Sequence, residues 1–388
     1  MWPRGSADAQ VGPLGILGGG QLGRMTLLAA GALGIDVVIG ERAPGSPAAR
    51  LTSSSVVFRE GWEDQQALDA LAAAAPVITL ENEFVDADVL RGLQRRGATV
   101  WPGPDCVATV QDKLIQKQAL LRAELPVPAF APIPHAQALQ QLGDELGWPL
   151  MVKARRDGYD GYGNALVHDT DEAQRACERL GWPKRQLYAE AFVDFVRELA
   201  VLVVRGQDGA LVTYPTVETQ QDPGLHICRA VLAPADVPAT VAEQAQQIAR
   251  GAVTAVDGVG AFGVELFLLP NDRVLLNELA PRPHNSAHYS IEACITSQFS
   301  NHVRAVFGLP FGSTDMRAPA AAMVNVLGHG GSAEANLGAA LTVGDVFVHL
   351  YGKTENRPGR KLGHVTALGL ARDEAAQRAQ RAADALGL

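Results

Sequence analysis

The sequence has 388 residues, of which 47% are hydrophobic and 19% are charged, with a formal net charge of −9. This length predicts two or three domains, and the acidic balance argues against nucleic acid as the main partner. The chain has no C-x-x-C pair, no signal-peptide pattern and no run approaching the ~20 apolar residues of a membrane span, so we expect no membrane association and a reduced, cytoplasmic location.

Residues 14–103 alternate β-rich runs with helical patterns, after a disordered arm at 1–13. The strands are expected at 14–17, 36–39, 56–58, 76–80 and 98–102, and the clearest helices at 21–34 and 66–75. Strands that alternate with crossover helices are typical of a parallel sheet. This part therefore predicts a Rossmann-like α/β domain.

A glycine loop, "GILGGGQLGRM", follows the first strand. Gly18, Gly20 and Gly23 fit G-x-G-x-x-G, and Glu41 lies 18 residues after Gly23. The spacing is that of a dinucleotide fingerprint with an acid for the ribose. Backbone N–H groups at a helix N-terminus favour any anion, however, and a tight turn without a ligand is also open. The pattern does not say whose phosphate is bound.

Residues 104–310 are expected to form a larger α+β unit, and we expect its lid at about 126–189. It opens with one helix at 105–125, stopped by Pro126 and Pro128. The strand 150–154 ends near Lys153 and leads into the glycine-rich "RRDGYDGYGN". A glycine-rich hairpin after a strand lysine could close over nucleotide phosphates, and an ordinary flexible hairpin is the alternative.

Two glutamates stand out in "GVELFLLPNDRVLLNELAPR". A two-residue turn at Asn271 and Asp272 would place Glu265 opposite Glu278, where two carboxylates repel each other in apolar strands. A Mg²⁺ ion between them, with Asn277 beside it, would remove that conflict. Alternatively, each glutamate meets an arginine such as Arg282.

Residues 311–388 form a smaller tail with strands at 321–328 and 345–351 and a helix at 374–386. Between them, "RPGRKLGHV" is expected to be a basic loop. Its positive charge in an acidic protein suggests an anion pocket, with a solvated loop as the alternative.

Five segments, "GILGGGQLGRM", "YDGYGN", "FGVELF", "NELAPRPHNS" and "RPGRK", occur in one order. Together they resemble the ATP-grasp enzymes of purine biosynthesis that make N5-carboxyaminoimidazole ribonucleotide. The resemblance implies an ATP-grasp fold with an N-terminal Rossmann-like domain and a small C-terminal domain. It implies a ligase that uses ATP, Mg²⁺ and bicarbonate to carboxylate 5-aminoimidazole ribonucleotide through carboxyphosphate. It also implies a homodimer, and no nicotinamide at the glycine loop.

The same resemblance assigns roles to residues of this chain. It places Mg²⁺ on Glu265 and Glu278 and the bicarbonate-derived group near Arg282, His284 and Lys361. The catalytic residues would be Arg282, His284, Asn285 and Lys361. The ribonucleotide would contact Gln21, Leu22, Glu81, Tyr159, Asp160, His284, Asn285, Lys353, Arg360 and Lys361. ATP would contact Lys113, Lys153, Gly158, Tyr159, Asp160, Gly161, Tyr162, Gly163, Asn164, Glu190, Ala191, Phe192, Val193, Glu198, Gln221, Asn277 and Glu278.

Some positions depart from the family pattern. Asp157 replaces a lid glycine, Tyr162 a basic residue, and Gln221 stands where many relatives have histidine. Two other functions stay open. One is a sister ATP-grasp ligase, such as formate-dependent glycinamide ribonucleotide transformylase or biotin carboxylase. The other is a non-catalytic or NAD-binding Rossmann protein.

Overall fold

The computed structural model describes residues 11–135, 138–158, 163–225, 227–332 and 334–388. Within them, a parallel five-stranded sheet begins the chain in the order β3-β2-β1-β4-β5. Its strands are β1 Leu14–Leu17, β2 Val37–Glu41, β3 Ser55–Val57, β4 Val77–Leu80 and β5 Thr99–Val100, and its helices are α1 Gln21–Gly31, η1 Ala49–Leu51, α2 Gln65–Ala74 and α3 Ala87–Arg95. The strand order reverses between β1 and β4, where such sheets leave a crevice for ligands. The predicted Rossmann-like architecture is confirmed.

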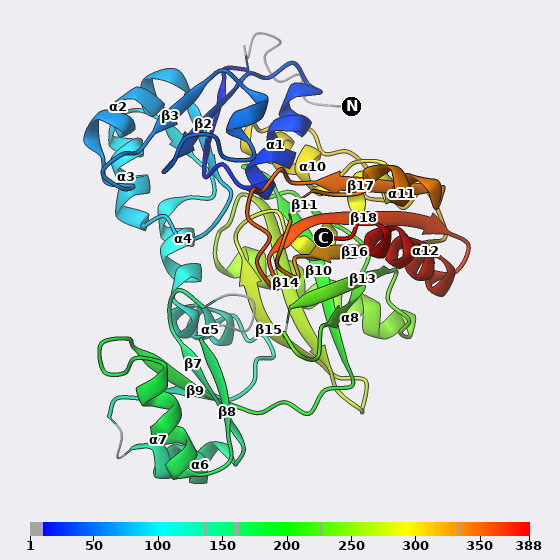
Figure 1. The fold of residues 1–388 in the computed structure, drawn as a ribbon. Coiled ribbons are helices and arrows are strands. Elements are labelled where there is room, and N and C mark those ends of the chain that lie inside the picture. Colours follow the sequence, from blue (N-terminus) through cyan, green and yellow to red (C-terminus); the bar gives the residue numbers. More distant parts are fainter. Residues whose placement is uncertain (1–10, 136–137, 159–162, 226, 333) are drawn as a thin grey trace.

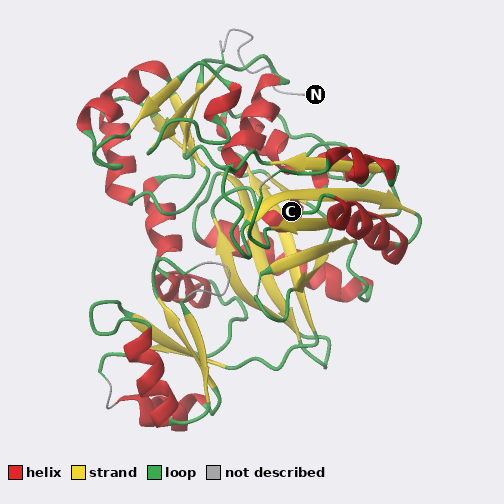
Figure 2. Ribbon diagram, in the orientation of Figure 1, coloured by secondary structure: helices red, strands yellow, loops and turns green. Residues whose placement is uncertain are grey.

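A second sheet forms the small lobe at the lower left of Figure 1, drawn as strands backed by helices in Figure 2. In the described chain its order is β6-β9-β7-β8, and α6 and α7 pack on it through one apolar cluster. The elements are β6 Phe130–Pro132, α6 Ala138–Leu146, β7 Leu150–Ala154, β8 Asn164–Val167, α7 Thr170–Arg179 and β9 Leu187–Ala191.

The largest sheet lies in the centre of the molecule (Figure 2). Its described strands run β15-β14-β10-β12-β13-β16-β18-β17, with β11 against β10. Their bounds are β10 Arg197–Arg205, β11 Leu211–Thr213, β12 Val217–Gln221, β13 Cys228–Ala233, β14 Gly260–Leu268, β15 Val274–Ala280, β16 Ala320–Leu327, β17 Val346–Leu350 and β18 Lys361–Gly369. The helices around it are α8 Ala239–Ala255, η2 Asn285–Ala287, α9 Ser290–Ala293, α10 Gln298–Val306, α11 Leu337–Thr342 and α12 Arg372–Ala385.

The single helix expected at 105–125 is wrong, because the chain forms two helices there. α4 Pro104–Gln111 ends at Asp112, whose backbone is extended, and α5 Lys113–Arg122 begins directly after it. The Asp112 carboxylate accepts hydrogen bonds from the Leu114 and Ile115 amides and so caps α5. The break places Lys113 at the first turn of a new helix.

The basic loop expected at 357–365 is partly wrong, because Lys361 already begins β18. β18 pairs with β16, and β16 pairs with β13 of the central sheet. The strands of the tail therefore extend the central sheet, and Lys361 is held at the end of a strand.

His302 of α10 joins the first sheet to the central sheet. Its Nδ1 accepts a hydrogen bond from the Ala261 amide of β14 at 3.0 Å, so its Nε2 carries the hydrogen and donates to the Thr79 hydroxyl of β4 at 2.9 Å. The side chain is fully buried, and this burial lowers the pKa of His302 to about 4. A neutral histidine thus satisfies one polar group on each sheet.

Replacing His302 with leucine should lower the free energy of unfolding at pH 7.5 by about 2–4 kcal/mol, because two buried polar groups lose their partner. The wild-type contribution is complete above pH 6.5 and is lost as the pH falls toward 4, because the unfolded chain binds the proton more readily. The difference between the two proteins should therefore shrink by about 2 kcal/mol between pH 7.5 and pH 5. Urea unfolding at both pH values measures it, and a pH-independent difference would contradict the assignment.

Candidate active site

The glycine loop wraps around a side chain of its own protein. The Glu81 carboxylate, just after β4, accepts a hydrogen bond from the Gly23 amide at 2.9 Å. A Cβ added at Gly18 would lie 2.3 Å from Glu81, and one at Gly20 2.5 Å from its carboxylate. Burial raises the pKa of Glu81, while the Gly23 and Gly20 amides oppose that rise. An internal carboxylate therefore occupies part of the place where a dinucleotide would put its pyrophosphate.

Glu41, the candidate for binding a ribose, is also engaged inside the protein. It is 3% exposed and accepts a hydrogen bond from the Ser46 amide at 3.1 Å. The second half of the dinucleotide fingerprint is thus a structural residue at the end of β2.

Two cavities, of about 450 and 480 Å³, adjoin each other at the meeting point of the three sheets. The same described residues form the wall between them: Lys113, Gly158, Glu265, Glu278, His284, Asn285 and Lys361. We call this set the shared wall. It brings together both predicted metal ligands and three of the four predicted catalytic residues, His284, Asn285 and Lys361.

The predicted pairing of Glu265 with Glu278 is confirmed, although the loop between the strands and the register beside it differ from the prediction. β14 and β15 are joined by a three-residue loop, because Leu269 pairs with Arg273, and Asp272 takes the left-handed conformation typical of such loops. This shifts the register near the loop by one residue. A bulge at Asn277 restores it, so that Glu265 lies opposite Glu278.

The two carboxyl groups differ in how readily they ionise, because their partners differ. Burial and the charge of Glu278 raise the pKa of Glu265. Burial also opposes ionisation of Glu278, but the ammonium of Lys113, which donates to its Oε2, outweighs it and holds the pKa below its usual range. Like charges on facing strands therefore disfavour two ionised carboxylates here without a further cation.

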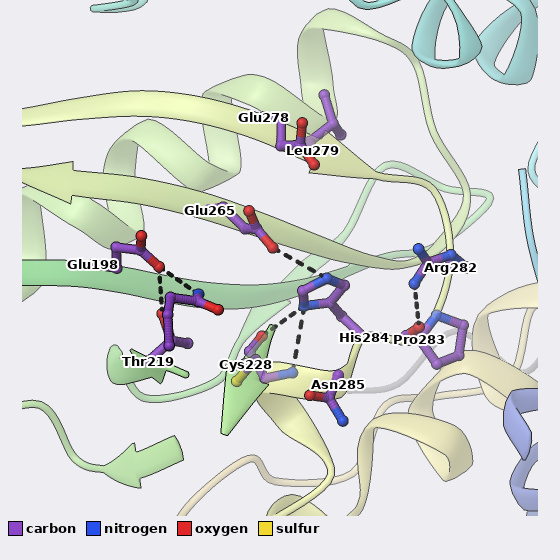
Figure 3. Close-up of polar contacts among 12 residues, drawn as sticks. Glu198, Thr219, Cys228, Glu265, Glu278, Leu279, Arg282, Pro283, His284 and Asn285 are labelled. Atoms are coloured by element: carbon purple, nitrogen blue, oxygen red, sulfur yellow. Dashed lines mark hydrogen bonds and ion pairs between the residues drawn. The ribbon is translucent and has the colours of Figure 1, made fainter. Parts of the chain in front are cut away.

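His284 lines both cavities and approaches Glu265. Its Nδ1 accepts from the Ser286 amide, which leaves the hydrogen on Nε2, 3.4 Å from Glu265 Oε1 (Figure 3). Burial, then Arg282 and Lys361, lower the pKa of His284 to about 3, so the ring is neutral. A Cβ at Gly263 would lie 2.3 Å from the ring, so only glycine permits this approach.

The larger cavity contains the residues predicted for ATP. Among the residues described, it is lined by Lys113, Lys153, Gly158, Asn164, Glu190, Ala191, Phe192, Val193, Glu198, Gln221, Asn277 and Glu278, whereas Gly163 does not line it. Gln221 donates to Glu198 at 2.5 Å, so this departure from the family pattern still contacts the predicted ribose acid.

Sequence reasoning missed the aromatic end of this cavity. The rings of Phe195 and Phe267 stack with centroids 4.6 Å apart, and both residues line the cavity. A signal was present for Phe267, because it lies two residues after Glu265 and shares its face of β14. Phe195 lies in a loop, where no periodicity predicts orientation.

The smaller cavity contains the predicted substrate residues Gln21, Leu22, Glu81, His284, Asn285 and Lys361. Arg282 also lines it and forms two hydrogen bonds with Glu83, at 2.5 and 3.1 Å. The alternative in which Arg282 pairs with Glu265 or Glu278 is therefore wrong, and Glu83 is a site residue that the sequence did not single out. Asn285 exchanges hydrogen bonds with Asn325 of β16 at 2.9 and 2.7 Å.

Two predicted substrate residues do not line either cavity. Lys353 and Arg360 line neither cavity: Lys353 donates to the Lys361 carbonyl at 2.8 Å, and Arg360 pairs with Glu355 at 2.6 Å. Tyr159, Asp160, Gly161 and Tyr162 lie outside the described residues.

Oxygen donors, rather than a cluster of soft ligands, characterise the candidate metal position. Within the described ranges, no group of three or more His, Cys, Asp or Glu side chains is arranged to hold a metal ion. The Asn277 Oδ1 atom beside the two glutamates is buried and has no hydrogen-bond partner among the described residues.

Of the helices described, none is long and apolar enough to cross a membrane.

Comparison with known proteins agrees with this geometry. Three family models match in order: a ribonucleotide synthetase preATP-grasp domain at residues 12–111, an ATP-grasp domain at 118–299, and a phosphoribosylaminoimidazole carboxylase C-terminal domain at 321–378. A structure of the Aspergillus clavatus carboxyaminoimidazole ribonucleotide synthase with ATP is 37% identical, with a TM-score of 0.88 over 97% of this chain and 98% of that chain.

Curated relatives match almost the whole of this chain. The phosphoribosylaminoimidazole carboxylase of Schizosaccharomyces pombe is 40% identical over 96% of this chain, which spans 67% of that protein. The N5-carboxyaminoimidazole ribonucleotide synthase of Synechococcus elongatus is 42% identical over 97% of this chain and 94% of its own length. The chain therefore belongs to the N5-carboxyaminoimidazole ribonucleotide synthase family of ATP-grasp ligases.

Proposed function

We propose that the protein carboxylates 5-aminoimidazole ribonucleotide, with ATP and bicarbonate, to N5-carboxyaminoimidazole ribonucleotide, ADP and phosphate. The observation that carries the proposal is the shared wall, because one set of charged residues faces both a nucleotide-sized cavity and a second polar cavity. The relatives named as N5-carboxyaminoimidazole ribonucleotide synthases, and an Aspergillus clavatus structure with ADP and 5-aminoimidazole ribonucleotide, support it.

In this proposal the larger cavity binds ATP. Lys113 and Lys153 neutralise phosphate charge, and Glu198, oriented by Gln221, accepts hydrogen bonds from the ribose. The stacked Phe195 and Phe267 supply an apolar surface at the same cavity. The role of the protein in phosphoryl transfer is mainly positioning and charge neutralisation.

The residues also fit a magnesium ion. Glu265, Glu278 and the Asn277 oxygen are hard donors on one strand pair, and the repulsion between the glutamates favours a cation. When bound, Mg²⁺ would neutralise charge on the transferred phosphoryl group. Neutral His284 donates toward Glu265 and holds that carboxylate in place.

The chemistry places the carboxyl group at the shared wall. A bicarbonate oxygen attacks the γ-phosphorus and releases ADP, and the carboxyphosphate then separates into CO₂ and phosphate. The amino nitrogen of the ribonucleotide attacks CO₂ and loses a proton. Lys361 and Arg282 supply positive charge for the anionic groups, and the enclosed site limits competing hydrolysis.

The ribonucleotide binds in the smaller cavity in this proposal. Because Glu81 already engages the Gly23 amide, the Gln21 and Leu22 backbone at the start of α1 is the part of the loop that meets the substrate. Roles for Lys353, Arg360, the lid residues 159–162, the domain boundaries, the homodimer and the cytoplasmic location stay predictions.

The variant Glu278→Gln should lower turnover at least a hundredfold, because it weakens Mg²⁺ binding and removes the partner of Lys113. Phosphate release measured across a Mg²⁺ titration tests this. Exposed Glu63→Gln serves as the control for loss of one carboxylate. Normal turnover of the Glu278 variant in limiting Mg²⁺ would refute the metal assignment.

The glycine loop should select the ribonucleotide over a dinucleotide. We expect 5-aminoimidazole ribonucleotide to raise the melting temperature and NAD or NADP at millimolar concentration to leave it unchanged, because Glu81 and the buried Glu41 disfavour a second phosphate-bearing ribose. Thermal unfolding with each compound measures these changes in melting temperature. A clear shift with NADH alone would support the dehydrogenase-like alternative.

Removing the Lys361 ammonium should separate nucleotide binding from carboxylation. We expect Lys361→Ala to bind MgADP within threefold of wild type but to lose about a hundredfold in turnover, since a cation that faces developing negative charge contributes about 3 kcal/mol. Lys361→Arg should rescue poorly, because a planar guanidinium does not replace a point charge. Calorimetry measures the MgADP affinity, and substrate-dependent phosphate release measures turnover. A larger loss of ADP affinity than of turnover would contradict the assignment.

A further inference from the structure

Three charged side chains meet in the interior, where the small sheet joins α5. The Glu190 carboxylate of β9 accepts from Lys153 of β7 at 3.0 Å through Oε1 and pairs with Lys117 of α5 at 3.1 Å through Oε2. The side chains of Glu190 and Lys117 are each 2% exposed, and that of Lys153 is 10% exposed. Two ammonium groups therefore share one buried carboxylate.

Only part of this triad reaches the nucleotide cavity. Lys153 and Glu190 line it, whereas Lys117 lies behind them and lines neither cavity. Lys117 also donates to the Leu276 carbonyl of β15 at 3.5 Å. The side chain thus connects α5 with β9 of the small sheet and with the strand that carries Glu278.

The charge balance explains why a second lysine would be useful. With Lys117 charged, the triad has a net charge of +1, and Lys153 is its only ammonium that lines the cavity. Without Lys117, Glu190 would neutralise Lys153 fully, and less attraction for an anion would remain. A buried ion pair contributes little stability by itself, so a role in binding accounts better for the extra charge.

We propose that Lys117 is a positioning residue for the nucleotide: it compensates Glu190 so that the Lys153 ammonium stays available to the phosphates. The inference rests on the proposed function, because it takes the larger cavity as the ATP site. It adds a residue outside the cavity, and it gives Glu190 a side-chain role within the triad.

The triad also predicts a pH dependence. Burial lowers the pKa of Lys117 to about 8, and Glu190 opposes that shift. The charged groups that act on Lys117 are Glu190 on β9, Lys153 on β7 and Glu278 on β15, and the Tyr188 hydroxyl of β9 donates to Glu190. Burial opposes ionisation of Glu190, but its two lysines hold its pKa below the usual range, and burial raises that of Tyr188. Lys117 is thus positioned to lose its charge as the pH rises from 7 to 9.

The test is calorimetric binding of MgADP and of adenosine to the full chain. Lys117→Met should weaken MgADP binding about tenfold and adenosine binding less than twofold, because the charge acts on the phosphates. Adding Glu190→Gln restores the net charge of +1, so the double variant should recover most of the lost MgADP affinity. The exposed Lys184→Met is the matched control, with affinities as in wild type.

The pH dependence of the wild-type protein tests the inference even if a variant does not fold. Its MgADP affinity should fall several-fold between pH 7 and pH 9, and Lys117→Met should lack this fall. A wild-type affinity that does not change with pH, an equal loss of ADP and adenosine binding, or a failure of Glu190→Gln to restore affinity would overturn the inference. If wild type does not bind MgADP at all, the proposed function itself fails.

Discussion

The site depends on the repulsion between two carboxylates held face to face. β14 and β15 place Glu265 opposite Glu278 by their strand pairing, and the apolar neighbours of both residues on these strands are buried. The protein relieves the conflict in two ways. Lys113 pairs with Glu278, and neutral His284 approaches Glu265. A pair of carboxylates that repel each other favours a cation, and this repulsion is the physical basis of the magnesium position that we propose.

Three local features position side chains around this strand pair. The break at Asp112 places Lys113 at the start of α5, within reach of Glu278. The bulge at Asn277 keeps the glutamates in register, and Gly263 leaves room for the His284 ring. Each feature positions side chains of the shared wall. The helix break and the bulge are local departures from regular structure, of a kind that commonly lies at functional sites.

The glycine loop shows how one sequence pattern can serve a different purpose. Its fold is that of a dinucleotide-binding turn, but Glu81 accepts the hydrogen bond of the Gly23 amide from inside the protein. The small glycine residues are needed there because a side chain would collide with Glu81. A motif therefore identifies the turn, and the residue that the fold brings opposite to it decides which ligand the turn can accept.

The sequence by itself determined the parallel first sheet, strands β7, β16 and β17 of the other two sheets, and the facing glutamates, because alternating apolar residues and turn residues are local signals. Motif order pointed to the family. The split at Asp112 follows from a local helix cap. The tertiary structure decided the strand that begins at Lys361, the pair of Arg282 with Glu83, and the triad of Lys117, Lys153 and Glu190. Those features depend on contacts between residues up to 199 positions apart, and no local pattern encodes which distant partner a side chain will meet.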